Sequence, residues 1–143
     1  MVRKLAQLIQ LRYDWYVAIS KGGLVPACLL GRLTSVNKID TFCATAYKEK
    51  KFDKVELIYK NYSHLRDQKV LLIDDLVDSG ATMQAVFDHL SLAWRPKLIH
   101  TAVLFKKSGS KFIPDYFAAE CEKDRWIEFP WEDDRLLGSF NGK

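Results

Sequence analysis

Three carboxylates and two hydroxyls lie within one short segment near the middle of the chain. Asp74 and Asp75 end a continuous apolar run, and Asp78 directly precedes residues 79–82, which read Ser-Gly-Ala-Thr. A small-residue turn of this kind offers free backbone N–H groups, two hydroxyls and a helix N-terminus, which together bind a phosphate group. Gly80 allows the backbone to approach the anion closely. The segment is therefore predicted to be a phosphate-binding turn.

Carboxylates beside a phosphate site would repel the ligand, so they must have a task of their own. The adjacent pair Asp74 and Asp75 is suited to the vicinal hydroxyls of a ribose, or to Mg²⁺ bound through water. Asp78, one residue before the turn, is placed to accept or donate a proton near the sugar. These residue types indicate a phosphorylated sugar as the ligand.

A strand and a helix must position these groups, and the sequence pattern predicts both. Residues 70–74 are an apolar run typical of a buried strand, and Met83, Val86 and Leu90 recur at helical spacing just after the turn. In an open α/β sheet, ligands bind beyond the carboxyl ends of the strands. The predicted turn lies at such an end.

The rest of the chain also alternates apolar runs with amphipathic stretches, which is typical of an α/β fold with a mostly parallel twisted sheet flanked by helices. We predict one domain over residues 1–143. An amphipathic helix opens the chain, and residues 24–33 are predicted to form a well-buried helix with Pro26 in its first turn. The other predicted strands cover residues 16–20, 40–47, 98–105 and, at one edge, 114–120.

Residues 48–69 differ from the rest because they are rich in lysine and contain only one short strand-like run, residues 55–59. We interpret them as a mobile basic hairpin or lid, although for each single lysine of residues 48–54 a solvated charged hairpin is the better explanation. The aromatic segment 124–131 is expected to close the fold, and residues 138–143 are expected to be disordered.

Composition excludes several classes of protein. The chain has 143 residues and a formal net charge of +4, which is too mild to indicate nucleic acid binding but suits an anionic small molecule. It has no apolar run of the roughly 18 residues that a membrane span needs, and no signal peptide is recognisable. Neither its three cysteines, Cys28, Cys43 and Cys121, nor its three histidines show metal-ligand spacing. We therefore expect a cytoplasmic protein with reduced cysteines.

Residues 74–82 resemble the phosphoribosyl pyrophosphate (PRPP) binding motif of type I phosphoribosyltransferases, in which two acidic residues precede D-[ST]-G-x-T. The alternative is the acidic strand end of a flavodoxin-like receiver, but receivers carry their acidic pair after the first strand. The resemblance extends from about residue 3 to residue 140, and it implies the type I phosphoribosyltransferase fold with a small C-terminal hood, about residues 106–133, and a mobile lid hairpin, about residues 47–69.

Residues 20–26 resemble the pyrophosphate loop of the same family; the alternative for this segment alone is a plain glycine turn joining strand to helix. The resemblance implies a non-proline cis peptide bond between Ser20 and Lys21. Lys21 stands where related proteins carry Arg, so the charge is kept and the bidentate geometry is lost. The residues that the resemblance assigns to PRPP are Ser20, Lys21, Gly22, Gly23, Asp74, Asp75, Asp78, Ser79, Gly80, Ala81 and Thr82.

The C-terminal part resembles the purine pocket of xanthine-guanine phosphoribosyltransferases. The resemblance assigns Lys106 as the donor to the purine 6-oxo group, Trp126 as the aromatic ring that stacks on the base, and Ile127 as the residue whose backbone meets its polar edge. Asp133 resembles a metal-contacting aspartate of the family. The alternative is that Trp126 and the aromatic residues after it form only a hydrophobic clasp.

The activity that the resemblance implies belongs to purine salvage. The 5-phosphoribosyl group of PRPP would pass to N9 of a 6-oxopurine (guanine, xanthine or hypoxanthine), giving the nucleoside monophosphate and pyrophosphate. Asp78 would be the catalytic base and Tyr47 would belong to the lid. Mg²⁺ would be held by Asp74, Asp75 and Asp133. The resemblance also implies a homodimer or homotetramer, with no nucleic acid partner and no membrane insertion.

Two alternatives remain open from the sequence. One is a regulatory protein that keeps this fold and binds PRPP as a signal. The other is a phosphoribosyltransferase for a different nucleobase, such as adenine or a pyrimidine, against which Lys106 and Trp126 argue.

Overall fold

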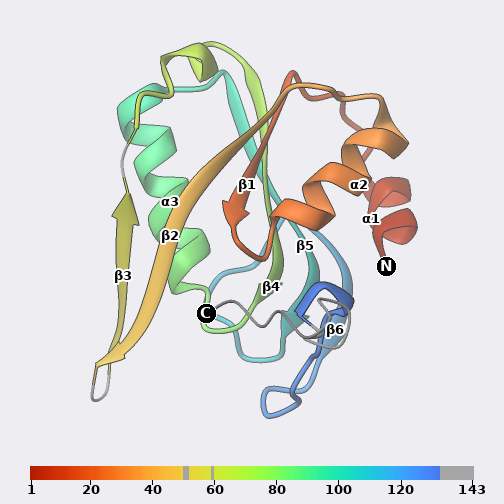
Figure 1. The fold of residues 1–143 in the computed structure, drawn as a ribbon, viewed down its shortest axis with the longest axis vertical. Helices are drawn as coiled ribbons and strands as arrows, with labels where there is room; N and C mark the ends of the chain where they lie inside the picture. Colours follow the sequence, from red (N-terminus) through yellow and green to blue (C-terminus); the bar gives the residue numbers. More distant parts are fainter. Residues whose placement is uncertain (50–51, 59, 133–143) are drawn as a thin grey trace, which may run out of the picture.

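The computed structural model describes residues 1–49, 52–58 and 60–132. Its centre is a six-stranded sheet in the order β3-β2-β1-β4-β5-β6, in which every neighbouring pair except β2 and β3 is parallel (Figure 1). The strands are β1 (Trp15–Ser20), β2 (Ile39–Glu49), β3 (Phe52–Ile58), β4 (Lys69–Val77), β5 (Leu98–Lys107) and β6 (Tyr116–Cys121). The helices are α1 (Val2–Leu8), α2 (Leu24–Thr34) and α3 (Ala81–His89), and α3 continues into a π-helical turn, Leu90–Trp94. The predicted α/β fold is confirmed.

The central strands bury both of their faces. Tyr16 and Ala18 of β1 pack into a cluster with α1 and α2, whereas Val17 and Ile19 pack into a second cluster with α3. The two clusters lie on opposite sides of the sheet because successive side chains of a strand alternate between its faces. Strands covered on both sides are continuously apolar, which is why β1 and the first half of β4 were recognisable in the sequence.

The direction in which the chain builds the sheet reverses between β1 and β4. These two strands are hydrogen-bonded neighbours, but β2 lies on the outer side of β1 and β5 on the outer side of β4 (Figure 1). At such a switch point the loops that follow the two strands diverge and leave a crevice at the carboxyl edge. Residues 21–23 after β1, 78–80 after β4 and 108–115 after β5 therefore meet at one edge of the sheet.

Two details differ from the sequence prediction. Strand β4 does not end at Asp74 but continues to Val77, so the acidic pair lies on the strand itself. The prediction of a well-buried α2 is wrong, because Leu24, Leu29 and Leu33 are each at least 40% exposed. Only one stripe of this helix can face the sheet, so apolar residues on its other side remain in contact with solvent.

Among the helices of the described residues, none combines the length and the apolar character that a membrane crossing requires.

Candidate functional site

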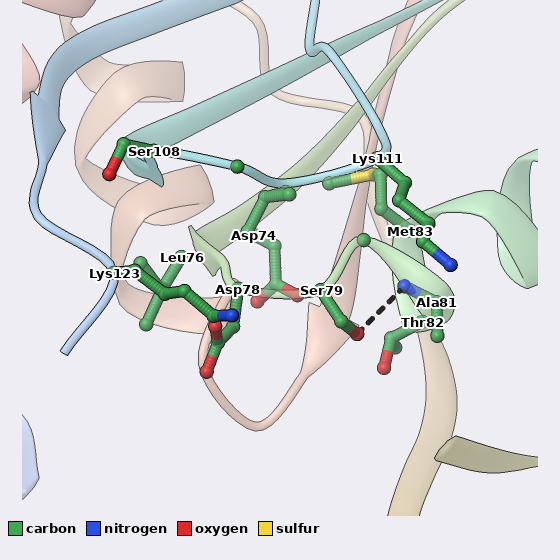
Figure 2. Close-up of a pocket in the computed structure, with 13 residues that line it drawn as sticks. Asp74, Leu76, Asp78, Ser79, Ala81, Thr82, Met83, Ser108, Lys111 and Lys123 are labelled. Atoms are coloured by element: carbon green, nitrogen blue, oxygen red, sulfur yellow. Dashed lines mark hydrogen bonds between the residues drawn. The ribbon is translucent and has the colours of Figure 1, made fainter. Parts of the chain in front are cut away.

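The turn between β4 and α3 has the geometry of an anion cradle. Gly80 has φ +93°, a left-handed conformation that favours glycine, and α3 begins directly after it. The Ala81 N–H donates to Ser79 Oγ at 3.3 Å, which curls the turn toward the start of the helix (Figure 2). A cavity of about 470 Å³ opens over the turn, and its walls include Asp74, Asp78 and Thr82. Backbone N–H groups, hydroxyls and a helix N-terminus thus face one space large enough for a phosphorylated sugar.

The acidic pair Asp74 and Asp75 lies next to this cavity, and Asp74 lines it. The Asp75 N–H donates to Asp74 Oδ1 at 2.9 Å, which holds the Asp74 carboxylate near the backbone. Burial and the neighbouring charge of Asp75 raise the pKa of Asp74 well above its usual value. Burial and the charge of Glu132 likewise raise the pKa of Asp75, while the Leu76 N–H opposes this rise. Both pKa values are thus raised by burial beside another carboxylate, as expected of a site that binds a cation or hydroxyl donors.

The glycine loop after β1 packs directly against the acidic pair. A Cβ on Gly23 would lie 2.2 Å from the Ile73 carbonyl oxygen, so this position has no room for a side chain. A Cβ on Gly22 would lie 2.5 Å from Asp75 Oδ1 and would displace that carboxylate. The peptide bond between Ser20 and Lys21 is cis, as the family resemblance implies. A second cavity of about 410 Å³ is lined by both segments, and its walls are Ile19, Ser20, Lys21, Gly22, Ala44, Thr45, Asp74, Asp75, Thr82 and Glu132.

Two consecutive lysines at the end of β5 point in different directions. Lys107 Nζ lies 3.2 Å from Asp78 Oδ2, directly after the point where Lys106 and Val77 pair β5 with β4. Lys106 Nζ lies 3.1 Å from Glu120 Oε2 on the neighbouring strand β6, and 5.6 Å from the centre of the Phe117 ring. Adjacent residues of a strand face opposite sides of the sheet, so only Lys107 of this pair reaches the predicted catalytic residue.

Comparison with known proteins assigns this architecture to a family. The model of the phosphoribosyl transferase domain matches residues 3–134. The chain belongs to the phosphoribosyltransferase family. The xanthine-guanine phosphoribosyltransferase of Chromohalobacter salexigens is 33% identical over 126 residues, which are 88% of this chain and 73% of that protein. The enzyme of the same name from Desulfotalea psychrophila is 36% identical over 118 residues, 81% of this chain and 68% of that protein.

Solved structures agree with this assignment. The purine phosphoribosyltransferase of Pyrococcus horikoshii superposes with a TM-score of 0.76 at 28% identity, covering 92% of this chain and 84% of that one. The xanthine-guanine-hypoxanthine phosphoribosyltransferase of Helicobacter pylori has a TM-score of 0.75 at 25% identity, and the match covers 95% of this chain and 87% of that one. This phosphoribosyltransferase chain therefore shares its fold, and not only its motifs, with purine-related members of the family.

The residues predicted to contact the purine lie outside the two cavities. Trp126 of this phosphoribosyltransferase is 84% exposed, whereas Ile127 is partly buried against the cluster that contains Phe129. Phe129 stacks on Trp131 with ring centres 4.9 Å apart. The aromatic segment thus has two parts, a packed clasp of Phe129 and Trp131, and Trp126, which stands free of it in solvent.

Three residues near the site were not found from the sequence. Lys111 and Lys123 line the larger cavity and Glu132 lines the smaller one. Glu132 directly precedes the predicted metal-contacting residue Asp133 in the sequence. The two lysines had no local signal, because they come from loops that only the fold brings to the turn.

The lid and one metal candidate are described only in part. Strands β2 and β3 form an antiparallel pair in which Tyr47 lies opposite Lys54, so the lysine-rich segment forms the predicted hairpin in this phosphoribosyltransferase. The segment between this hairpin and β4 contains a short 3-10 helix, Ser63–Leu65. Asp133 lies outside the described residues.

Proposed function

We propose that this protein transfers the 5-phosphoribosyl group of PRPP to N9 of a 6-oxopurine, releasing pyrophosphate, as a purine-salvage enzyme. The observation that carries the proposal is the convergence of three loops at the switch point of the sheet. The glycine loop after β1, the acidic turn after β4 and the lysine-bearing end of β5 meet there, with an ion pair between Lys107 and Asp78. The names of the related proteins supply the class of base.

The donor PRPP would be bound by the glycine loop after β1 and the acidic turn after β4. Ser79, Gly80, Ala81 and Thr82 would hold the 5′-phosphate through backbone N–H groups and hydroxyls. Asp74 and Asp75 would accept hydrogen bonds from the ribose hydroxyls. The diphosphate would lie along the glycine loop, where the absence of side chains lets it approach the backbone, and the exposed Lys21 would balance its charge. The residues of that loop are Ser20, Lys21, Gly22 and Gly23.

Asp78 would act as the general base. As the bond from C1 of the ribose to N9 forms, its carboxylate would take a proton at the purine N7, which keeps the base electron-rich. Lys107 holds this carboxylate at 3.2 Å from its ammonium group. We therefore favour Lys107 as the donor to the purine 6-oxo group, because it lies beside the proposed base. Lys106, which the resemblance assigns to this role, is the second candidate, since it faces Glu120 on β6 instead.

Mg²⁺ fits the residues that are present. The described part of the chain holds no cluster of three or more metal-ligating side chains, so a metal held by the protein alone is not indicated there. Mg²⁺ commonly binds through one or two carboxylates together with substrate phosphates. Asp74 and Asp75 would supply the carboxylates, with Glu132 or the predicted Asp133 as a further ligand. When bound, the ion neutralises charge on the departing diphosphate.

The remaining predicted elements would complete the site around the base. Trp126 would stack on the purine and Ile127 would meet its edge through the backbone, within a hood over about residues 106–133. The hairpin of the lid, about residues 47–69 with Tyr47, would cover the donor and exclude water during transfer. We include all of this in one domain over residues 1–143.

We further propose a cytoplasmic homo-oligomer, a dimer or a tetramer. The outer side of α2 carries Leu24, Leu29 and Leu33, all exposed in the single chain, and Leu29 and Leu33 lie one helical turn apart. Exposed apolar residues of this kind are typical of a subunit interface. Size-exclusion chromatography with light scattering tests this, and a monomer at micromolar concentration would contradict it.

The activity test is PRPP-dependent consumption of guanine, xanthine, hypoxanthine, adenine and uracil, followed by absorbance with and without Mg²⁺. Turnover confined to the 6-oxopurines and dependent on Mg²⁺ would support the proposal. Turnover of adenine or uracil alone would favour the different-base alternative. PRPP binding without turnover of any base would favour the regulatory alternative.

A further inference from the structure

The phosphate turn has a shortage of positive charge. Residues 79–82 are Ser, Gly, Ala and Thr, so the turn offers dipoles and hydroxyls but no cation of its own. The charged side chains nearest to it in the sequence are the carboxylates of Asp74, Asp75 and Asp78. A 5′-phosphate carries close to two negative charges at neutral pH. A cation from another part of the fold would therefore contribute strongly to its binding.

The loop after β5 is held against this turn by contacts at its backbone. The Lys111 N–H donates to the Ser79 carbonyl oxygen at 3.2 Å. A Cβ on Gly80 would lie 2.5 Å from Phe112 Cβ and 2.8 Å from Phe112 N, which shows how closely the loop crosses the glycine. The Phe112 ring packs edge-on against Phe87 of α3, with ring centres 6.2 Å apart. The loop is thus fixed to both the turn and the helix that follows it.

This attachment directs Lys111 into the cavity. Figure 2 shows the Lys111 side chain extending from the loop toward the first turn of α3, on the side of Ala81 and Thr82. Within the described residues, Lys111 forms no ion pair with any carboxylate, in contrast to Lys106 and Lys107. Its ammonium group is therefore available to an anion in the cradle.

Resting on the proposed function, we propose that Lys111 is a further binding residue of the donor site, which supplies to the 5′-phosphate the positive charge that the turn lacks. The contact distinguishes the two ends of PRPP. The diphosphate would lie by the smaller cavity with Lys21, whereas Lys111 lines only the larger one. Lys111 would thus favour ligands with a phosphate on the ribose over ligands that carry only pyrophosphate.

The test compares Lys111→Gln and Lys111→Arg with Lys97→Gln, an exposed lysine that directly precedes β5, at the end of the strand away from the crevice. Ribose 5-phosphate and magnesium pyrophosphate serve as separate probes, titrated by calorimetry into each purified protein. We expect Lys111→Gln to weaken ribose 5-phosphate binding about five- to twentyfold, with pyrophosphate binding changed less than twofold. Lys111→Arg should retain most of the wild-type affinity for ribose 5-phosphate, because it keeps the positive charge. Lys97→Gln should bind both probes as the wild type does.

The kinetic counterpart is the KM of PRPP, which should rise in Lys111→Gln while the KM of the base stays constant. Unchanged ribose 5-phosphate binding in a folded Lys111→Gln protein would overturn the proposal. Equal weakening of both probes would also overturn it, because that result indicates a general charge effect. The ribose 5-phosphate titration measures binding and needs no turnover, so it tests the role of Lys111 even if the enzyme assay shows no activity. Failure of the proposed function would instead appear as a wild-type protein that turns over no base.

Discussion

The donor side and the base side of the crevice are built in different ways. On the donor side, Gly23 and Gly80 have no room for a Cβ, and the loops pack backbone against backbone. On the base side, the predicted stacking residue Trp126 is 84% exposed and touches neither cavity. The donor side is thus preformed by the fold, whereas the base side depends on individual side chains that the base itself must engage. Changes on the two sides should therefore have different consequences.

The largest effect is expected where the two sides meet, at Asp78. Asp78→Asn should lower kcat about ten- to a thousandfold while PRPP binding is retained, because the amide keeps the size of the side chain but cannot accept the proton. Steady-state kinetics and a PRPP titration measure the two quantities. Wild-type turnover in this variant would contradict the assignment of Asp78 as base.

The next largest effect should come from the preformed backbone of the donor side. Gly80→Ala should raise the KM of PRPP about thirtyfold, because the new methyl group meets Phe112 and the φ of +93° disfavours alanine. Gly109→Ala is the matched control, since its φ is +82° but nothing lies within 4 Å of the added Cβ. A similar rise in both variants would show that backbone conformation alone, and not the closeness of the loop, sets donor binding.

On the base side, the two adjacent lysines should behave differently. Lys107→Gln should raise the KM of the purine about tenfold, because it removes the ammonium group that faces Asp78. Lys106→Gln should change this KM less than twofold, since it mainly breaks an ion pair with the half-exposed Glu120. The reverse order of effects would restore Lys106 as the 6-oxo donor.

The smallest effect should be at Trp126. Trp126→Ala should raise the KM of the purine about fivefold, near the lower end for base stacking, because the free side chain must be ordered when the base binds. The thermal unfolding midpoint should not change, because a side chain that is 84% exposed contributes little to the core. A lower midpoint would show that Trp126 belongs to the hydrophobic clasp instead.

The backbone geometry of the donor side was easier to predict from the sequence than the placement of side chains on the base side, for a physical reason. The turn at residues 79–82 and the glycine loop depend on local backbone geometry, which small residues encode directly. The choice between Lys106 and Lys107 depends on which face of β5 each residue occupies, and a shift of one position reverses it. Lys111 was not recognisable, because it reaches the turn only through the packing of a distant loop. The exposed side of α2 was misjudged because apolar residues in a helix do not reveal which of them face the sheet.

The loop from Lys107 to Phe112 has a practical consequence for attempts to redesign the enzyme. One end of it pairs with Asp78, and the other is hydrogen-bonded to Ser79 and packed on Gly80. Exchanging residues near Lys107 to admit another base, or changing the length of the loop, would also displace Lys111 and the backbone that covers the turn. We expect grafts from relatives with other base preferences to succeed only when the whole loop is transferred together with residues 78–80.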